Sequence, residues 1–321
     1  MKILATAPAR ISLFGGGTDV PSYFTKYGGK VINMAINLRQ HVKVYVGDDL
    51  FGHNGNKFPY DADPRLFYEI FKKYGLNGIH HIGIRSEFDG FVKSGLGSSA
   101  SAAVALIGGF YKHIGKKLDR AAIAEEAWDI EVNTLGWYGG KQDQYAAAYG
   151  GMNLIEFGKQ VKVTPLPRKQ AENLLFSMVL IYIGGTRESR DIQKGFKELT
   201  EEQIKALDAI KSYVDKAQHY INRGDLRSVG TLMHEVWQLK KKSNKGVSNP
   251  KIDEIYNYAF ENGALGGKIL GAGGAGYMLF IVKPEDKENF IGKMKENGYE
   301  DIDFSIDWNG VEARIVSGVE L

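Results

Sequence analysis

The segment Gly95–Ile107 constrains the fold and the chemistry of this chain more than any other. A glycine-rich turn leads directly into an alanine-rich helix, with serine hydroxyls at the junction. The first N–H groups of a helix lack partners within the helix and carry a partial positive charge, and glycine lets an anion approach them. The segment therefore predicts a phosphate cradle made by Gly95, Leu96, Gly97, Ser98, Ser99, Ala100 and Ser101, with serine oxygens as further donors or Mg²⁺ ligands. A helix that begins with a serine cap is the alternative.

The composition excludes several classes of protein. The chain has 321 residues, no cysteine and a net charge of +3. Disulfides and thiolate zinc sites are impossible without cysteine. The charge is too small and too dispersed to favour a nucleic-acid partner, and no stretch approaches the roughly 20 apolar residues of a membrane span. The N-terminus lacks a signal peptide, so we expect a cytoplasmic protein with no membrane partner. The oligomeric state is not indicated.

The periodicity predicts strands and helices in both halves of the chain. In the first half we expect strands at 1–14 and 31–47 and helices at 98–113, 118–135 and 141–149. In the second half we expect a strand at 177–183, helices at 200–222, 225–244, 250–262 and 284–297, and two strands flanking 271–276. The proline-rich, charged stretch 165–170 is the predicted boundary. The sequence thus indicates two domains, 1–165 and 166–321.

A second glycine cluster, Gly271–Gly276, matches the Gly-x-Gly-x-x-Gly pattern of dinucleotide-binding proteins. That pattern must leave a strand and enter a helix. Here the apolar run 277–282 follows, which predicts a strand. We therefore interpret the cluster as a loop that backs another element or the active site.

Glu131 interrupts an apolar helix face formed by Ala124, Ala127, Trp128 and Leu135. A carboxylate on a buried face requires a cation, a metal ion or hydrogen bonds. The pattern predicts either an internal salt bridge or a metal ligand. Asp143 lies in the first turn of the helix at 141–149, where it is either a helix-start acid stabilised by the dipole or a functional carboxylate.

Three motifs in order resemble those of the GHMP kinase superfamily, which includes galactokinase, homoserine kinase and mevalonate kinase. They are Pro8–Asp19, Gly95–Ala100 and Lys268–Gly276, and Gly140–Gln144 is similar to the family's catalytic segment. Within the superfamily, the stretches 14–24, 140–151 and 252–256 resemble the D-glycero-D-manno-heptose 7-phosphate kinase group. One departure is Phe91, which occupies a position where the family usually has proline.

The resemblance implies an α+β, two-domain fold, with a ribosomal protein S5 domain 2-like N-terminal domain and a ferredoxin-like C-terminal domain. It also implies that ATP and Mg²⁺ are the cofactors, with the phosphates on the 95–101 loop and Mg²⁺ on Ser99 and Glu131. Asp143 would orient or deprotonate the acceptor hydroxyl, and Arg10 would stabilise the transferring charge. Whether Asp143 acts as a base or only orients the hydroxyl stays open.

The expected acceptor is a sugar or sugar phosphate, most specifically the anomeric 1-hydroxyl of D-glycero-D-manno-heptose 7-phosphate. Asp19 corresponds to the family's sugar-hydroxyl acceptor. A distal phosphate needs cations or N–H donors away from the ATP loop, and the segment after the strand at 177–183 offers them. The predicted substrate residues are Gly17, Thr18, Asp19, Gly140, Thr186, Arg187, Gly273 and Gly274.

Two alternatives remain. The first is another small-molecule kinase of the superfamily, similar to galactokinase, fucokinase or mevalonate kinase; Thr18-Asp19 after a glycine run favours a polyhydroxylated acceptor. The second is a non-catalytic sugar-binding homologue. Such proteins lose the catalytic aspartate or the metal carboxylate, whereas this chain keeps Asp143, Arg10, Glu131 and Ser99.

Overall fold

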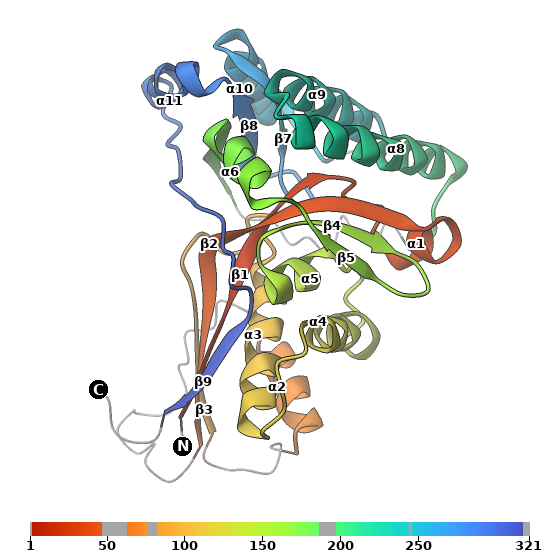
Figure 1. Cartoon of the computed structure of the whole chain (residues 1–321), viewed down its shortest axis with the longest axis vertical. Helices are drawn as coiled ribbons and strands as arrows, with labels where there is room; N and C mark the ends of the chain where they lie inside the picture. The colour runs from red at the N-terminus through yellow and green to blue at the C-terminus, as the bar shows by residue number, and fades with distance from the viewer. Residues whose placement is uncertain (1, 47–62, 76–81, 186–196, 244–245, 317–321) are drawn as a thin grey trace.

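The structure is a computed structural model that describes residues 2–46, 63–75, 82–185, 197–243 and 246–316. Two antiparallel sheets, each with its own helices, are stacked along the long axis of the molecule (Figure 1). The α+β class expected from the sequence is confirmed.

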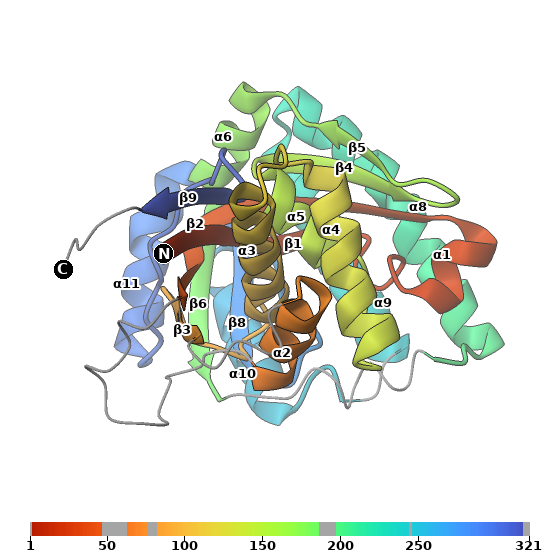
Figure 2. The ribbon, with the colours of Figure 1, turned by 90° about the horizontal axis from the view of Figure 1, so that it is seen from below.

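Within the described residues, the larger sheet has six strands in the order β5-β4-β2-β1-β9, and β3 also pairs with β2. Its strands are β1 (Lys2–Phe14), β2 (Gly29–Val46), β3 (Ile82–Phe88), β4 (Met152–Phe157), β5 (Lys162–Pro165) and β9 (Glu312–Val316). Helices α2 (Pro64–Lys73), α3 (Ser98–His113), α4 (Arg120–Asp129) and α5 (Gln142–Tyr149) cover one face of it (Figure 2). Alanines of α3 at zero exposure, such as Ala102 and Ala105, allow this helix to lie close to the sheet.

The smaller sheet has the order β6-β8-β7, with β6 (Met178–Gly184), β7 (Ala264–Ile269) and β8 (Gly276–Val282). It carries the helices α6 (Arg168–Phe176), α8 (Glu201–Arg223), α9 (Leu226–Ser243), α10 (Pro250–Glu261) and α11 (Lys287–Glu296). Local signals fix several ends. Thr200 and Gln203 form a capping box at the start of α8, and Gly224 in the left-handed region ends it.

A shared core joins the two sheets. One buried cluster contains Phe14 and Met34 of the larger sheet together with Leu207 of α8 and Leu279 of β8. Apolar burial across the junction stabilises the placement of one sheet on the other. The packing at this junction therefore fixes the positions of residues at the ends of β1 and β7.

The chain after α11 crosses back from the smaller sheet to the larger one (Figure 1). Ile302 N–H donates to Leu180 O at 2.8 Å, and Asp307 N–H donates to Ala35 O at 3.0 Å. The following strand, β9, pairs antiparallel with β1. Its charged residues, Glu312 and Arg314, suit an edge strand. They alternate with Ala313 and Ile315, but the run is only five residues long and the sequence analysis missed it.

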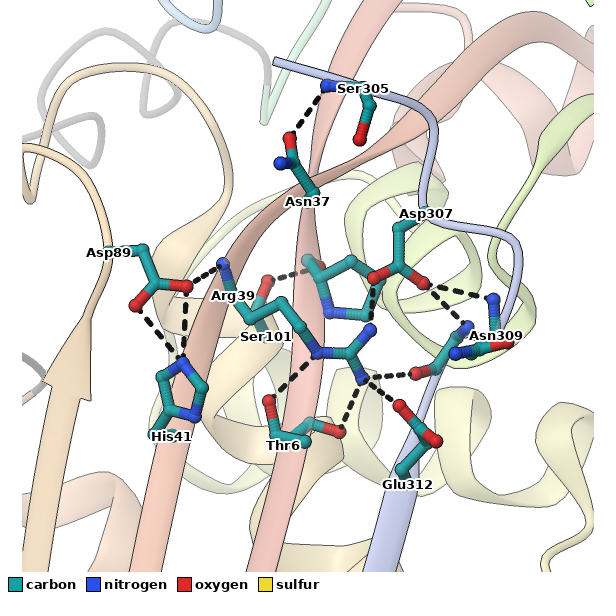
Figure 3. A network of polar contacts seen from close by, with 12 residues as sticks. Thr6, Asn37, Arg39, His41, Asp89, Ser101, Ser305, Asp307, Asn309 and Glu312 are labelled. Carbon is teal, nitrogen blue, oxygen red and sulfur yellow. Dashed lines mark hydrogen bonds and ion pairs between the residues drawn. The ribbon is translucent and has the colours of Figure 1, made fainter. Parts of the chain in front are cut away.

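Arg39 of β2 binds residues of the segment that leads into β9 (Figure 3). Its guanidinium forms an ion pair with Asp307 and donates to Gly310 O at 2.7 Å and to Thr6 Oγ1 at 3.0 Å. Glu312 lies 3.2 Å from the same group. The first and last strands are thus connected by side-chain as well as backbone bonds.

Two further local differences from the expectations have clear causes. Residues 168–170, the second half of the predicted boundary stretch, are the start of α6, because Pro167 O accepts from the N–H groups of Gln170 and Ala171 while Leu174 packs into the core. The helix expected at 118–135 is α-helical only to Asp129 and continues as a π-helical turn, Ile130–Thr134. Such wide turns occur frequently at functional sites, and this one carries Glu131.

Candidate active site

The segment 95–101 forms the predicted turn and helix start. Gly97 adopts φ +77° at the position before α3, and Ser101 N–H donates to its carbonyl at 3.0 Å. Arg10 N–H of β1 donates to Leu96 O at 3.0 Å, which fixes the loop to the sheet. Ser98 and Ser99 are partly exposed, whereas Leu96 and Ala100 are buried. The helix N-terminus thus faces the site with the geometry that binds anions elsewhere.

The serine hydroxyls of this segment point in different directions. Ser99 Oγ donates to Glu131 Oε1 at 2.9 Å. Ser101 is 1% exposed, and its hydroxyl donates to Pro8 O at 2.8 Å. Ser101 therefore ties α3 to β1, while Ser99 faces the carboxylate that the sequence singled out.

Arg10 and Asp143 form a bidentate ion pair beside the 95–101 loop. Arg10 Nε donates to Asp143 Oδ1 and Nη2 donates to Oδ2, both at 2.7 Å. Arg10 Nη1 donates to Gly95 O at 2.6 Å. A Cβ on Gly97 would lie only 3.0 Å from Asp143 Oδ2, so glycine there lets the loop backbone approach the carboxylate. The Arg10 side chain is 7% exposed and that of Asp143 is 27% exposed, which leaves Asp143 lone pairs open to a ligand.

Glu131 is 6% exposed, as its apolar helix face predicts. Its carboxylate accepts from Ser99 Oγ and from Gln144 Nε2, the latter at 2.5 Å. Both donors are neutral and both lie at helix starts, Ser99 on α3 and Gln144 on α5. The described residues contain no cluster of three or more His, Cys, Asp or Glu side chains suited to a metal ion. A magnesium ion held by one carboxylate, one hydroxyl and substrate phosphates needs no such cluster.

Asp19 is a buried carboxylate, 3% exposed, surrounded by neutral donors. It accepts from Gly17 N–H at 3.0 Å, Gln142 N–H at 3.2 Å and Gln142 Nε2 at 3.1 Å. Burial, and secondly the negative charge of Asp143, raise the pKa of Asp19, and the backbone donors only partly oppose this. Two carboxylates in unlike surroundings therefore share one site.

The glycine and threonine beside Asp19 have structural contacts. A Cβ on Gly140 would collide with Asp19 Oδ2, so only glycine fits this approach. The Thr18 hydroxyl donates to Gly15 O at 2.8 Å and lies 2.9 Å from Lys30 O. Gly17 and Gly140 therefore shape the surroundings of Asp19, and Thr18 closes the turn beneath them.

The third motif lies against the first glycine loop. A Cβ on Gly271 would lie 2.5 Å from Gly95 Cα, and Tyr277 N–H donates to Ser94 O at 3.2 Å. Gly273 and Gly274 pack on the α9–α10 connection, where Gly274 N–H donates to Val247 O at 3.0 Å. Residues 276–282 form a strand, so the structure confirms that this cluster backs another element and is not a dinucleotide fingerprint.

Some predicted residues cannot be compared with the structure, and some residues near the site were not predicted. Thr186 and Arg187 lie outside the described residues. Gln142, which holds Asp19, was not singled out by the sequence analysis. Lys240, discussed below, was considered only together with Lys241 and Lys242, as a weaker candidate for binding the distal phosphate of the acceptor. Gln142 stands between Lys141 and Asp143 in the recognised motif, and this neighbourhood was the only available signal. Within the described ranges, no helix is long and apolar enough to cross a membrane.

Comparison with known proteins agrees with this architecture. A model of the GHMP kinase N-terminal domain matches residues 65–151, and one of the GHMP kinase C-terminal domain matches residues 217–300. The chain is 35% identical, over 98% of its length and 99% of the relative, to D-glycero-alpha-D-manno-heptose 7-phosphate kinase of Campylobacter jejuni. The chain belongs to the GHMP kinase family, and it is an enzyme of the kinase class.

The chain is also similar to two solved structures and to a relative of lower sequence identity. A D-glycero-D-manno-heptose 1-phosphate kinase from Bacteroides thetaiotaomicron has a TM-score of 0.77 at 26% identity, covering 98% of this chain and 100% of the other. A putative sugar kinase from Campylobacter jejuni has a TM-score of 0.74 at 31% identity, with 98% of each chain covered. Mevalonate kinase of Pyrococcus horikoshii is 28% identical over 89% of this chain and 90% of that protein.

Proposed function

We propose that this kinase transfers a phosphoryl group from ATP to the anomeric 1-hydroxyl of D-glycero-D-manno-heptose 7-phosphate. The observation that carries the proposal is the Arg10–Asp143 ion pair directly beside the backbone of Gly97. For in-line transfer, the acceptor hydroxyl must lie next to the bound phosphates. A carboxylate beside a phosphate-binding helix start can hold the hydroxyl there. The heptose acceptor follows from the 35% identical relative and from the sugar-type first motif.

The phosphate end of the site is assigned to the loop and its neighbours. The N–H groups of 97–100, which precede the first hydrogen bond within α3, bind the ATP phosphates at the positive end of the helix. Ser99 and Glu131 would hold Mg²⁺, since their oxygens lie 2.9 Å apart and both are hard ligands. Mg²⁺ supplies neutralisation of phosphate charge when bound.

The acceptor end is assigned to the two aspartates. Asp143 accepts the hydrogen bond of the attacking hydroxyl, and Arg10 holds both of its oxygens so that the carboxylate cannot rotate away. Asp19 accepts from a second sugar hydroxyl; Gly140 leaves room for the Asp19 carboxylate, and Gly17 N–H helps to hold it. Gly273 and Gly274 remain proposed contributors to the acceptor side through the backbone of their loop. Thr18, Thr186 and Arg187 remain sequence predictions for acceptor binding.

The proposal is tested by a coupled ADP-release screen of the wild-type enzyme with heptose, heptose 7-phosphate, galactose, fucose and mevalonate. We expect the highest kcat/KM for D-glycero-D-manno-heptose 7-phosphate, with the new phosphate on C1 in the ³¹P spectrum of the product. Asp143→Asn serves as the background for contaminating ATPase. A preference for mevalonate, or for a sugar without phosphate, would overturn the acceptor assignment. Absence of turnover with every acceptor would favour a non-catalytic sugar-binding protein.

A further inference from the structure

Three consecutive lysines end α9, and the structure separates them. Lys242 is exposed to solvent. Lys241 forms an ion pair with Asp253 of α10 at 3.0 Å and lies over the Trp237 ring. Lys240 instead points toward the glycine loops, where its Nζ donates to Gly271 O at 3.0 Å.

That contact places the Lys240 ammonium at the junction of the two glycine loops. Gly271 packs directly on Gly95, and Gly95 O accepts from Arg10 Nη1 at 2.6 Å. Lys240 therefore reaches the loop assigned to the phosphates through one residue, Gly271, whose carbonyl accepts from Lys240 and whose backbone packs on Gly95. Lys240 thus comes from the smaller sheet's helices to the same place that Arg10 reaches from the larger sheet.

The charged groups around Lys240 come from three elements. Arg10 on β1 and Lys268 on β7 are cations, and Asp19 after β1 is the opposing carboxylate. Loss of hydration, and secondly the charge of Arg10, lower the pKa of Lys240 to about 8, while Asp19 acts in the opposite direction. Burial, with the charges of Lys240 and Arg10, also lowers the pKa of Lys268, whose Nζ donates to Leu13 O at 3.1 Å.

Cations gathered in this way are stabilised when an anion binds among them. Asp143 already has both oxygens on Arg10, and Asp19 already accepts three N–H bonds. An arriving oxyanion is therefore the group that this arrangement accommodates. Phosphate oxygens suit a lysine ammonium, which binds them as a compact point charge.

We propose that Lys240 is a phosphate-binding residue of this site, contacting a phosphate oxygen on the acceptor side of the phosphate loop. The inference rests on the proposed kinase function and deepens it. The phosphate has two possible sources, the group in transfer from ATP and the phosphate already carried by the acceptor. The chemistry is the same for both, and the kinetic experiment separates them.

The first test compares Lys240→Met and Lys240→Arg with the matched control Lys242→Met, two positions further on the helix. With heptose 7-phosphate, Lys240→Met should lower kcat/KM by about 10- to 100-fold, the loss expected for one charge-assisted hydrogen bond. A loss in kcat with both heptose 7-phosphate and unphosphorylated heptose assigns Lys240 to the transferring group. A rise in KM for the phosphorylated acceptor alone assigns it to the acceptor's phosphate. Equal kinetics of Lys240→Met and Lys242→Met overturn the proposal.

The pH profile tests the charge directly. Wild-type kcat/KM should fall as the pH rises through the pKa of Lys240, because the neutral amine cannot attract a phosphate oxygen. Lys240→Arg stays charged at every accessible pH. It should therefore keep its activity above pH ~9, where the wild type has declined. Parallel decline of both enzymes contradicts the proposal.

A labelling experiment separates this inference from the acceptor assignment. Acetylation of Lys240 in the full-length wild-type protein is followed by mass spectrometry without ligand, with inorganic phosphate, and with ATP and Mg²⁺. We expect protection of Lys240 by about fivefold or more with inorganic phosphate or with ATP, and none of Lys242. Protection with no turnover of heptose 7-phosphate would reject the proposed substrate and keep the phosphate site. Labelling unchanged by both ligands would reject the phosphate site alone.

Discussion

Asp143 and Asp19 are close enough for the charge of one to affect the other, but they are held in opposite ways. Asp143 is partly exposed and bound by both arms of Arg10, at 2.7 Å each. Asp19 is almost fully buried and receives only neutral N–H donors from Gly17 and Gln142. One carboxylate has a full countercharge and the other has none among these contacts.

Because of this difference, we expect the two carboxylates to have different roles. A charge-paired and rigid carboxylate suits the orientation of a reacting hydroxyl, because its geometry is fixed before the substrate arrives. A buried carboxylate with a raised pKa suits hydrogen bonding to a second hydroxyl, since a sugar donor supplies part of the hydration that burial removed. Unlike environments for paired acids are a common way to give them unlike roles.

The largest expected effect is on Asp143. Asp143→Asn keeps the volume but removes the charge, so it should lower kcat by at least about 10²-fold while ATP affinity changes little. Asp215→Asn is a matched control, because Asp215 also pairs with a cation, Lys30, but on the surface. Stopped-flow or coupled assays of turnover give kcat, and calorimetry gives the ATP affinity. Near wild-type turnover of Asp143→Asn would show that Asp143 is not the acceptor-orienting group.

A second prediction concerns Glu131, the carboxylate that accepts from Ser99 and Gln144. Glu131→Gln should raise the Mg²⁺ concentration for half-maximal activity by about tenfold or more, since an amide is a poor ligand for a hard cation. Asp129→Asn, an exposed carboxylate two residues earlier in the chain, is the control. Unchanged Mg²⁺ dependence in a less stable Glu131→Gln protein would instead assign Glu131 a purely structural part.

A third prediction disturbs Asp19 without changing it. Gly140→Ala places a methyl group where the Asp19 carboxylate now lies, so Asp19 must move. KM for the acceptor should rise about 10- to 100-fold, the loss expected for a hydrogen bond to a charged group, with KM for ATP unchanged. Gly292→Ala, in open space on α11, is the matched control. A rise in KM for ATP of equal size would mean that the whole cleft had shifted.

Local sequence patterns predicted the 95–101 loop and the position of Asp143, but not the contacts that join distant residues around Asp19. Glycine spacing and helix-start chemistry were enough to place the 95–101 loop, and the position of Asp143 in a first turn followed from the same signals. The bond from Gln142 to Asp19 joins residues 123 positions apart. No periodicity reports such a contact, and without the recognised motifs Asp19 would be one acid among many.

The same limit explains the other omissions. Ser99 and Ser101 have identical chemistry, and only the packing of α3 on β1 determines which hydroxyl faces the site. Lys240 looks like its two neighbours in the sequence, and the position of β7 beside α9 distinguishes it. Strand β9 alternates charged and apolar residues over only five positions, which is too short a run to stand out by periodicity. Long-range packing therefore decides what composition and spacing leave undetermined.

The smallest predicted effect is the dependence of stability on pH that Asp19 causes. Its pKa is raised in the folded protein, so the folded state binds the proton more tightly than the unfolded state does. The contribution of Asp19 to the free energy of unfolding therefore falls as pH rises from the ordinary aspartate pKa of 3.8 through the raised pKa. Asp19→Asn lacks this loss, so the variant should gain stability relative to the wild type between acidic and neutral pH.

Urea denaturation at a series of pH values measures that difference. Part of the shift comes from the charge of Asp143, so the pH-dependent gain from Asp19→Asn should be smaller in an Asp143→Asn background. Asp215→Asn again supplies the control background, because Asp215 lies elsewhere, on the exposed face of α8. A gain that is the same at every pH would show that Asp19 is not destabilised by burial. An equal gain in the Asp143→Asn and Asp215→Asn backgrounds would show that the two carboxylates do not interact, and the contrast between them would then rest on geometry alone.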